Sequence, residues 1–184
     1  MKSEHKHSTN DILARKYQQG QKEALPWLIK RFHSSLTRII LYYTKDHDPV
    51  KDIAQECWVD IIHGLENGSM RTTFDPWALA IARNKAIDWV RVQRRERIRR
   101  NELINEHRSK QSIKETDTDS RNDKILKLRN SIAQLPNTQR IILSLFYLEN
   151  HTIREISQIL TISEGTVKSR LYNARENLKN QMNR

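Results

Sequence analysis

The sequence predicts an all-α fold of two small helical domains joined by a polar linker. Apolar residues recur at helical spacing along nearly the whole chain, strand-like runs are scarce, and there are only four glycines and four prolines. The 184 residues leave room for one domain or two small ones. We predict a flexible tail, a first domain, a linker and a second domain at residues 1–10, 11–97, 98–122 and 123–184.

Nearly all of the net charge of +11 lies in the two expected domains. Residues 1–97 hold 17 basic and 12 acidic side chains, and residues 123–184 hold 10 and 5. Two separately cationic modules suit a polyanion that is contacted at two places. Charge alone would equally fit RNA or an anionic membrane surface.

Cysteine usage and hydropathy predict a cytoplasmic protein without membrane insertion. The single Cys57 excludes an internal disulfide framework and suits a reducing compartment. No apolar run approaches the ~20 residues that span a bilayer. The first residues are not followed by a hydrophobic signal core.

The first domain begins with a helical pattern at Asp11 that breaks near Gly20. A longer helix is expected from about Pro26 to about Tyr43. Asp48-Pro49 then predicts a helix start, with Asp48 as the N-cap and the proline in the first turn. The buried stripe of that helix comprises Val50, Ile53, Ala54, Cys57, Trp58, Ile61 and Leu65. Its opposite face carries Asp52, Gln55, Glu56 and Val59, which by themselves indicate only a solvated surface.

The next helix follows an expected loop over residues 64–73 and a second start signal, Asp75-Pro76. Its core face is predicted to hold Leu79, Ala82, Ala86 and Val90. A second stripe comprises Trp77, Ile81, Asn84, Asp88, Arg91 and Arg95, with Asp88 and Arg91 spaced for a surface ion pair. Residues 83–100 contain eight basic and two acidic side chains. Cations beside tryptophans suit a strand of opened DNA, because aromatic faces stack on bases.

The second domain is predicted to contain a helix-turn-helix. A helix should follow the break at Leu135-Pro136, capped by Asn137 or Thr138. Thr152 can cap a later helix that ends in a turn at Thr161 and Ile162, and Ser163 can cap the helix after that turn, with Glu164 in its first turn.

On a helical wheel, that last helix has an apolar face and a polar face. The apolar face comprises Val167, Leu171, Ala174 and Leu178, and the polar face comprises Ser169, Tyr172, Asn173 and Glu176, flanked by Lys168 and Arg170. A recognition helix in a DNA major groove needs polar tips for base edges and cations for phosphates. A plain helical hairpin with a solvated charged face is the alternative.

The amino-acid sequences of these segments resemble those of the extracytoplasmic-function (ECF) group of bacterial sigma factors. Ser-Glu-Gly-Thr-Val-Lys-Ser-Arg-Leu at residues 163–171 is similar to their C-terminal helix-turn-helix. Lys-Asp-Ile-Ala-Gln-Glu-Cys-Trp at residues 51–58 is similar to the Glu-Asp-Leu-x-Gln-Glu-x-Phe signature of their domain two, although Lys51 replaces an acid. Residues 77–91 resemble the stretch Trp-Leu-x-x-Ile-Ala-x-Asn-x-x-x-Asp-x-x-Arg, with Ala78 in place of its leucine. The resemblance covers roughly residues 20–97 and 123–180.

The resemblance implies that core RNA polymerase and promoter DNA are the partners. Asp52, Gln55, Glu56 and Val59 would bind polymerase. Trp77, Asn84, Arg91 and Arg95 would hold the melted minus-ten element, with a flipped base captured somewhere in residues 66–74. Ser169, Tyr172 and Asn173 would read the minus-thirty-five element, while Lys168, Arg170 and Arg175 contact phosphates. An anti-sigma factor is a further partner that many relatives have.

Two other functions fit parts of the sequence. A stand-alone DNA-binding regulator of LuxR type would explain residues 123–184. It would leave the polar face of residues 52–59 and the helix from Trp77 to Arg95 without a purpose. A nuclease or phosphotransferase would need a phosphate loop, a metal-spaced ligand set or a nucleophile–base pair, and the sequence shows none of these. We therefore expect neither cofactor nor metal, and no enzymatic activity.

Overall fold

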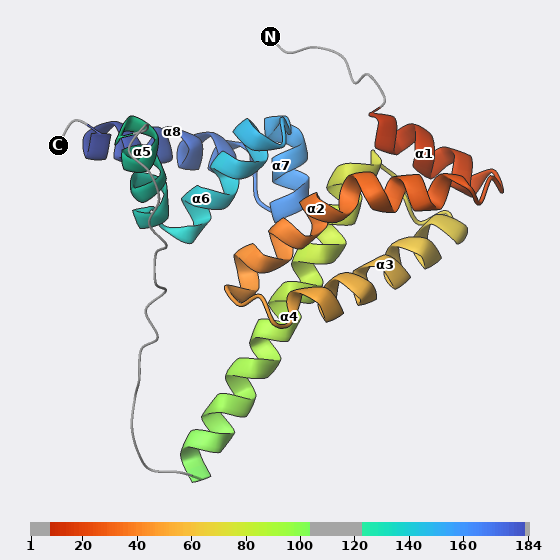
Figure 1. Cartoon of the computed structure of the whole chain (residues 1–184), viewed down its shortest axis with the longest axis horizontal. Coiled ribbons are helices and arrows are strands. Elements are labelled where there is room, and N and C mark those ends of the chain that lie inside the picture. Colours follow the sequence, from red (N-terminus) through yellow and green to blue (C-terminus); the bar gives the residue numbers. More distant parts are fainter. Residues whose placement is uncertain (1–7, 104–122, 183–184) are drawn as a thin grey trace.

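A computed structural model describes residues 8–103 and 123–182, and every regular element in these ranges is helical. The prediction of an all-α fold is confirmed. The first domain contains α1 (Thr9–Gln18), α2 (Ala24–Thr44), α3 (Val50–Glu66) and α4 (Phe74–Leu103) (Figure 1). The second contains α5 (Asp123–Gln134), α6 (Asn137–Leu143), a π-helical turn η1 (Ser144–Leu148), α7 (Ile153–Leu160) and α8 (Glu164–Met182).

The core of the first domain lies between α2, α3 and α4. Leu28, Phe32, Leu36 and Ile40 of α2 follow one another at four-residue spacing, and all are buried. The Phe32 ring meets that of Phe74 edge-on, with 4.9 Å between the ring centroids. The stripe predicted for α3 is buried as expected from Ile53 to Leu65, and Val50 is half-buried at its start.

Small side chains bring α4 close to its neighbours. Ala78, Leu79, Ala82 and Ala86 are fully buried, which confirms the predicted core face, and Val90 is half-buried. Beyond this part the helix continues to Leu103, past the end expected near residue 97. Its C-terminal half extends beyond the other helices (Figure 1), and all its described residues from 91 to 100 are exposed.

The predicted helix starts of the first domain were wrong in detail. Pro49, not Asp48, is the N-cap of α3, and its helix has no side-chain cap. The backbone N–H of Asp48 instead donates to Asp46. Asp75 lies inside the first turn of α4, which begins at Phe74. Its carboxylate accepts a hydrogen bond from the side chain of Asn10, which lies in the first turn of α1.

The second domain encloses a core of its own. Ile142, Ile156, Ile159 and Val167 are fully buried, from α6, α7 and α8 in turn. Pro136 is the N-cap of α6 and no side chain caps this helix, so the caps predicted at Asn137 or Thr138 were wrong. Asn137 instead accepts a hydrogen bond from Arg140.

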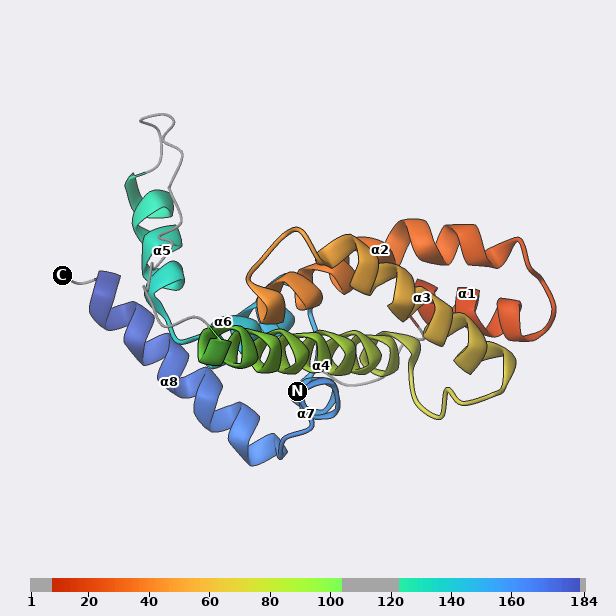
Figure 2. The ribbon, with the colours of Figure 1, turned by 90° about the horizontal axis from the view of Figure 1, so that it is seen from below.

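The two domains lie against each other, with α7 on α4 and α6 on α2 (Figures 1 and 2). Between the residues that the structure describes, two polar contacts cross this boundary. Arg38 of α2 pairs with Glu149 at 3.0 Å, and Arg83 of α4 donates to the Thr161 hydroxyl at 3.2 Å.

Candidate nucleic-acid interface

The turn between α7 and α8 is built from capping interactions that the sequence predicted in part. Thr152 caps α7 and forms a reciprocal capping box with Glu155. Thr161 ends the helix in the left-handed region, at a φ of 54°. The Ser163 hydroxyl then accepts the Thr166 N–H at 3.1 Å and begins α8. The predicted caps at Thr152 and Ser163 are confirmed, and they fix the direction in which α8 leaves the turn.

A buried histidine supports the first cap. His151 is 7% exposed and lies 3.8 Å from the Glu155 carboxylate and 3.9 Å from that of Glu149. The His151 imidazole, together with the N–H and hydroxyl of Thr152, lowers the pKa of Glu155 to about 2. No sequence pattern predicts this role of His151, because a single histidine before a helix belongs to no motif.

The two predicted faces of α8 are present, except that Glu176 of the polar face is half-buried. Val167, Leu171 and Ala174 are buried and Leu178 is half-buried, while Ser169, Tyr172 and Asn173 are exposed. Tyr172 is 63% exposed, so its ring is available to a partner. The Ser169 hydroxyl donates to the backbone carbonyl of Thr166 at 3.1 Å. Lys168 is exposed beside this face, and Arg170 is half-buried.

Arg175 occupies a position that the sequence did not reveal. Its Nε donates to the Tyr147 hydroxyl at 2.9 Å, and its guanidinium lies 5.7 Å from the ring centroids of both Phe146 and Tyr147. Cation–π contacts of this kind hold an arginine in one orientation. The aromatic pair is carried by η1, a π-helical turn, which a helical apolar pattern does not distinguish from α-helix.

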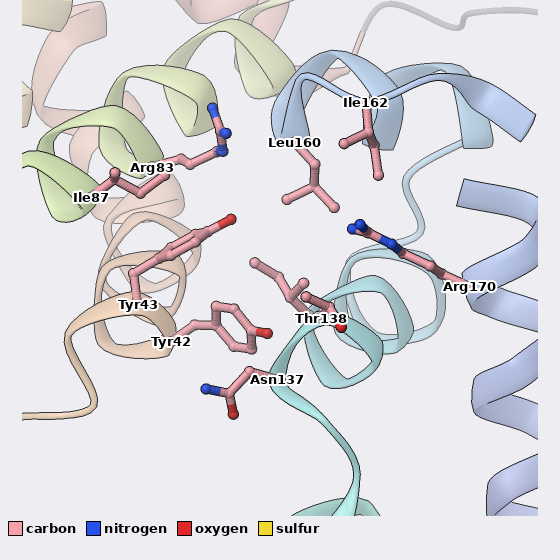
Figure 3. A pocket seen from close by; sticks show the side chains of 10 residues that line it. Tyr42, Tyr43, Arg83, Ile87, Asn137, Thr138, Leu160, Ile162 and Arg170 are labelled. Atoms are coloured by element: carbon pink, nitrogen blue, oxygen red, sulfur yellow. The ribbon is translucent and has the colours of Figure 1, made fainter. Parts of the chain in front are cut away.

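Arg170 lines a pocket of about 260 Å³ between the domains (Figure 3). Arg83 of α4 and the rings of Tyr42 and Tyr43 border the pocket on the side of the first domain. Burial raises the pKa of Tyr42. The pocket thus lies where α4 and the helix-turn-helix come together. The sequence predicted the two domains but not this contact between them.

The predicted stripe on α4 is divided between exposed and packed side chains. Asn84, Arg91 and Arg95 are exposed, and the expected ion pair between Asp88 and Arg91 is present at 3.2 Å. The side-chain amide oxygen of Asn84 accepts a hydrogen bond from the Arg83 guanidinium at 2.9 Å.

Trp77, the aromatic member of that stripe, is half-buried. Its ring lies so close to Gly64 that a Cβ there would stand 2.6 Å from the Trp77 Cζ2 atom.

The polar face of α3 is fully exposed. Asp52, Gln55, Glu56 and Val59 all lie at the surface, and Val59 is 52% exposed. Lys85 of α4 pairs with Glu56 at 3.3 Å and with Asp60 at 3.1 Å. Burial opposes the charge on Lys85, but its hydrogen bonds to the two carboxylates outweigh this effect and raise its pKa. Lys85 therefore fixes one edge of the acidic face, a role that its sequence position did not suggest.

The described residues contain neither a cluster of metal ligands nor a membrane-spanning helix. No group of three or more histidine, cysteine, aspartate or glutamate side chains there is arranged to hold a metal ion. None of the helices in these ranges is long and apolar enough to cross a membrane.

Comparison with known proteins assigns both halves of the chain to families. Residues 28–96 match the family described as Sigma-70 region 2, and residues 125–178 match Sigma-70, region 4. The ECF RNA polymerase sigma factor SigM of Bacillus subtilis is 30% identical over 85% of this chain and 94% of its own length. The ECF RNA polymerase sigma-E factor of Haemophilus influenzae is 25% identical over 95% of each chain.

Solved structures share the same fold. The sigma factor RpoE of Bartonella quintana, in complex with the anti-sigma factor NepR, matches 86% of this chain and 96% of its own with a TM-score of 0.63 and 18% identity. CnrH, in complex with the cytosolic domain of CnrY, matches 95% and 97% with a TM-score of 0.62 and 20% identity.

Proposed function

Because the chain belongs to the ECF RNA polymerase sigma factors, which bind core RNA polymerase and direct promoter-specific transcription initiation, we propose how its own residues divide that work. The second domain would place Ser169, Tyr172 and Asn173 of α8 in the major groove of the minus-thirty-five element. Hydroxyl and amide groups read base edges there, where each base pair presents a distinct pattern.

Three cations around α8 would contact phosphates. Lys168 is exposed beside the reading face and Arg170 is half-buried at its edge. The Nε of Arg175 donates to the Tyr147 hydroxyl, which leaves the two terminal nitrogens of the guanidinium to contact the DNA. The aromatic contact would hold that guanidinium ready for a phosphate and reduce the side-chain entropy lost on binding.

The first domain would hold the melted minus-ten element along α4. Asn84, Arg91 and Arg95 are exposed along this helix. The charges of the two arginines would follow the backbone of a single strand, and the Asn84 amide would offer hydrogen bonds beside them. The loop between α3 and α4, residues 67–73, would capture a flipped base. Trp77 would support this loop and present the accessible part of its ring, because Gly64 covers the rest.

The exposed face of α3 would dock on core RNA polymerase. Asp52, Gln55 and Glu56 supply charge and amide groups, and Val59 adds an exposed apolar side chain.

The observation that carries this proposal is the division of α8 into two faces. Its apolar residues Val167, Leu171 and Ala174 are buried in the domain, whereas Tyr172 and Asn173 point to solvent beside Lys168. The helix is therefore anchored through one side only. The other side is open to the major groove of a duplex.

Run-off transcription with purified core polymerase tests the proposal. Genomic fragments should yield discrete transcripts when this chain is added and no other sigma factor is present. Neither core alone nor the chain alone should produce them. A chain that binds duplex DNA but gives no specific transcript with core would leave only the function of a stand-alone regulator.

An anti-sigma partner stays a prediction for this chain. The relative RpoE was solved in complex with the anti-sigma factor NepR, and the same type of partner would keep this chain from core polymerase. Co-purification of the chain from its native cells, followed by identification of bound protein, would reveal such a partner.

A further inference from the structure

Helix α1 touches both ends of the loop formed by residues 67–73. This helix precedes the residues matched to the sigma families, which begin at 28, and the sequence predicted only a helical pattern there, without a role. In the structure, four of its polar side chains contact residues at the boundaries of the loop. We propose that α1 is a clamp that positions this loop for base capture. The inference rests on the proposed function of the loop.

The N-terminal end of α1 holds the end of the loop that leads into α4. Asp11 is only 3% exposed, and one of its carboxylate oxygens accepts the backbone N–H of Phe74. The other accepts the N–H of Ser8 at 3.0 Å, within a capping box that begins α1. Asn10 donates to the Asp75 carboxylate at 2.8 Å. Burial of a carboxylate is costly unless it is hydrogen-bonded, so Asp11 ties the start of α4 firmly to α1.

The C-terminal end of α1 holds the end of the loop that leaves α3. The Tyr17 hydroxyl donates to the Glu66 carboxylate at 2.8 Å, and the Gln18 side chain donates to the backbone carbonyl of Leu65 at 3.2 Å. The helix thus contacts the last two residues of α3 and the first two of α4. A rigid helix that joins both boundaries fixes the distance that the loop must span.

The loop itself is tied back to α3. The N–H of Ser69 donates to the Gly64 carbonyl at 2.8 Å, and Gly68 turns the chain at a φ of +65°. Gly64 also lets the Trp77 ring approach, since a Cβ would stand 2.6 Å from it. These contacts order the start of the loop, while α1 orders its ends, so loss of the clamp should loosen the loop without exposing the core.

A paired set of substitutions separates the clamp from general stability. The clamp variant carries Tyr17→Phe and Gln18→Ala, which remove both bonds to the end of α3 and leave the ring of Tyr17 in place. The matched control carries Tyr42→Phe and Gln19→Ala. The Tyr42 hydroxyl is buried and has no hydrogen-bond partner among the described residues, and Gln19 is exposed next to Gln18.

Hydrogen exchange of the full chain measures the loop directly. Amides of residues 67–73 should exchange roughly tenfold faster in the clamp variant than in the control, because two hydrogen bonds are lost. Asn10→Ala, which frees the other boundary, should act in the same direction. Unchanged exchange in both variants would overturn the clamp.

Binding of holoenzyme to a fork-junction promoter measures base capture. Abasic substitutions are scanned along the minus-ten element of the non-template strand. The wild-type chain should lose affinity sharply at one position, and the clamp variant should lose several-fold less there, while the control behaves like wild type. A purely structural defect would weaken binding to every promoter alike. The factor by which the abasic substitution lowers affinity would then be the same for the clamp variant and the wild type.

The outcomes distinguish the two claims. If the wild-type chain shows no sensitive position, the proposed capture of a base by this loop fails, and exchange still decides whether α1 clamps it. If the wild type is sensitive and the variant exchanges faster but keeps the full abasic penalty, α1 does not position the loop for capture and the inference is overturned.

Discussion

At the scale of single residues, Glu155 shows how one carboxylate supports the helix-turn-helix. It accepts the N–H of Thr152 at 2.7 Å and faces the buried His151. These partners favour its charged form and lower its pKa to about 2 from an ordinary 4.5. A group whose pKa is depressed in the folded state stabilises the fold above its unfolded pKa, and this stabilisation is lost as the pH falls.

We therefore predict that Glu155→Gln lowers the free energy of unfolding at neutral pH. The difference from wild type should persist down to about pH 4.5 and disappear as the pH falls toward 2. Urea titrations at a series of pH values measure it. Glu164→Gln is the matched control, because Glu164 is exposed in the first turn of α8. A difference that stays constant through this acid range would contradict the assignment.

At the scale of elements, α8 combines side chains for two separable tasks. Asn173 lies on the exposed face opposite the buried Leu171 and Ala174, whereas Lys168 lies at the flank. Contacts to base edges depend on sequence, and contacts to phosphates do not. Replacing Asn173 should therefore change which promoters are preferred, whereas replacing Lys168 should change the affinity for all of them.

Asn173→Ala should cost about 1–3 kcal/mol on the preferred promoter and relax the choice of base at one position. Lys168→Ala should weaken holoenzyme binding to all promoters alike and reduce the dependence of affinity on salt by about one charge. Equilibrium binding over a range of salt concentrations and promoter variants measures both.

Lys179→Ala, at the exposed last turn of the same helix, serves as the control for loss of charge alone. If Asn173→Ala leaves promoter preference unchanged, the reading face of α8 has been assigned to the wrong residues.

Elements with a clear period and a local cap could be predicted from the sequence. The caps at Thr152 and Ser163 depend on bonds between residues three apart, so the pattern contains them. The clamp could not be found in this way, because Asp11 meets Phe74 across 63 positions of the chain. The tie between Tyr17 and Glu66 spans 49 positions. A periodic pattern reports which face is buried and carries no information about such distant partners.

At the scale of the whole molecule, the two domains are docked rather than separate. The sequence predicts both from their composition and the linker, but nothing in it predicts the contact between α4 and α7. In that contact Arg83 donates to Thr161, in the turn before α8. Arg83 also donates a hydrogen bond to the side chain of its neighbour Asn84, which lies on the surface proposed to hold opened DNA. Arg83 thus links that surface to the turn that precedes α8, the helix proposed to read duplex DNA.

The ion pair between Arg38 and Glu149 is the contact through which this docking can be disturbed selectively. The Glu149 side chain is 8% exposed and lies 3.9 Å from His151, while the Arg38 side chain is 47% exposed. Exposed ion pairs contribute under ~1 kcal/mol, but a second carboxylate placed against the buried Glu149 would repel it. Arg38→Glu should thus separate the domains and leave each of them folded.

Small-angle X-ray scattering of the free chain measures this separation. Arg38→Glu should increase the radius of gyration, and Arg31→Glu, an equal change of charge at an exposed position of the same helix, should not. Adding Glu149→Lys to Arg38→Glu restores opposite charges and should bring the radius back toward that of the wild type. An Arg38→Glu chain as compact as the wild type would mean that apolar packing between α4 and α7 holds the domains together without the ion pair.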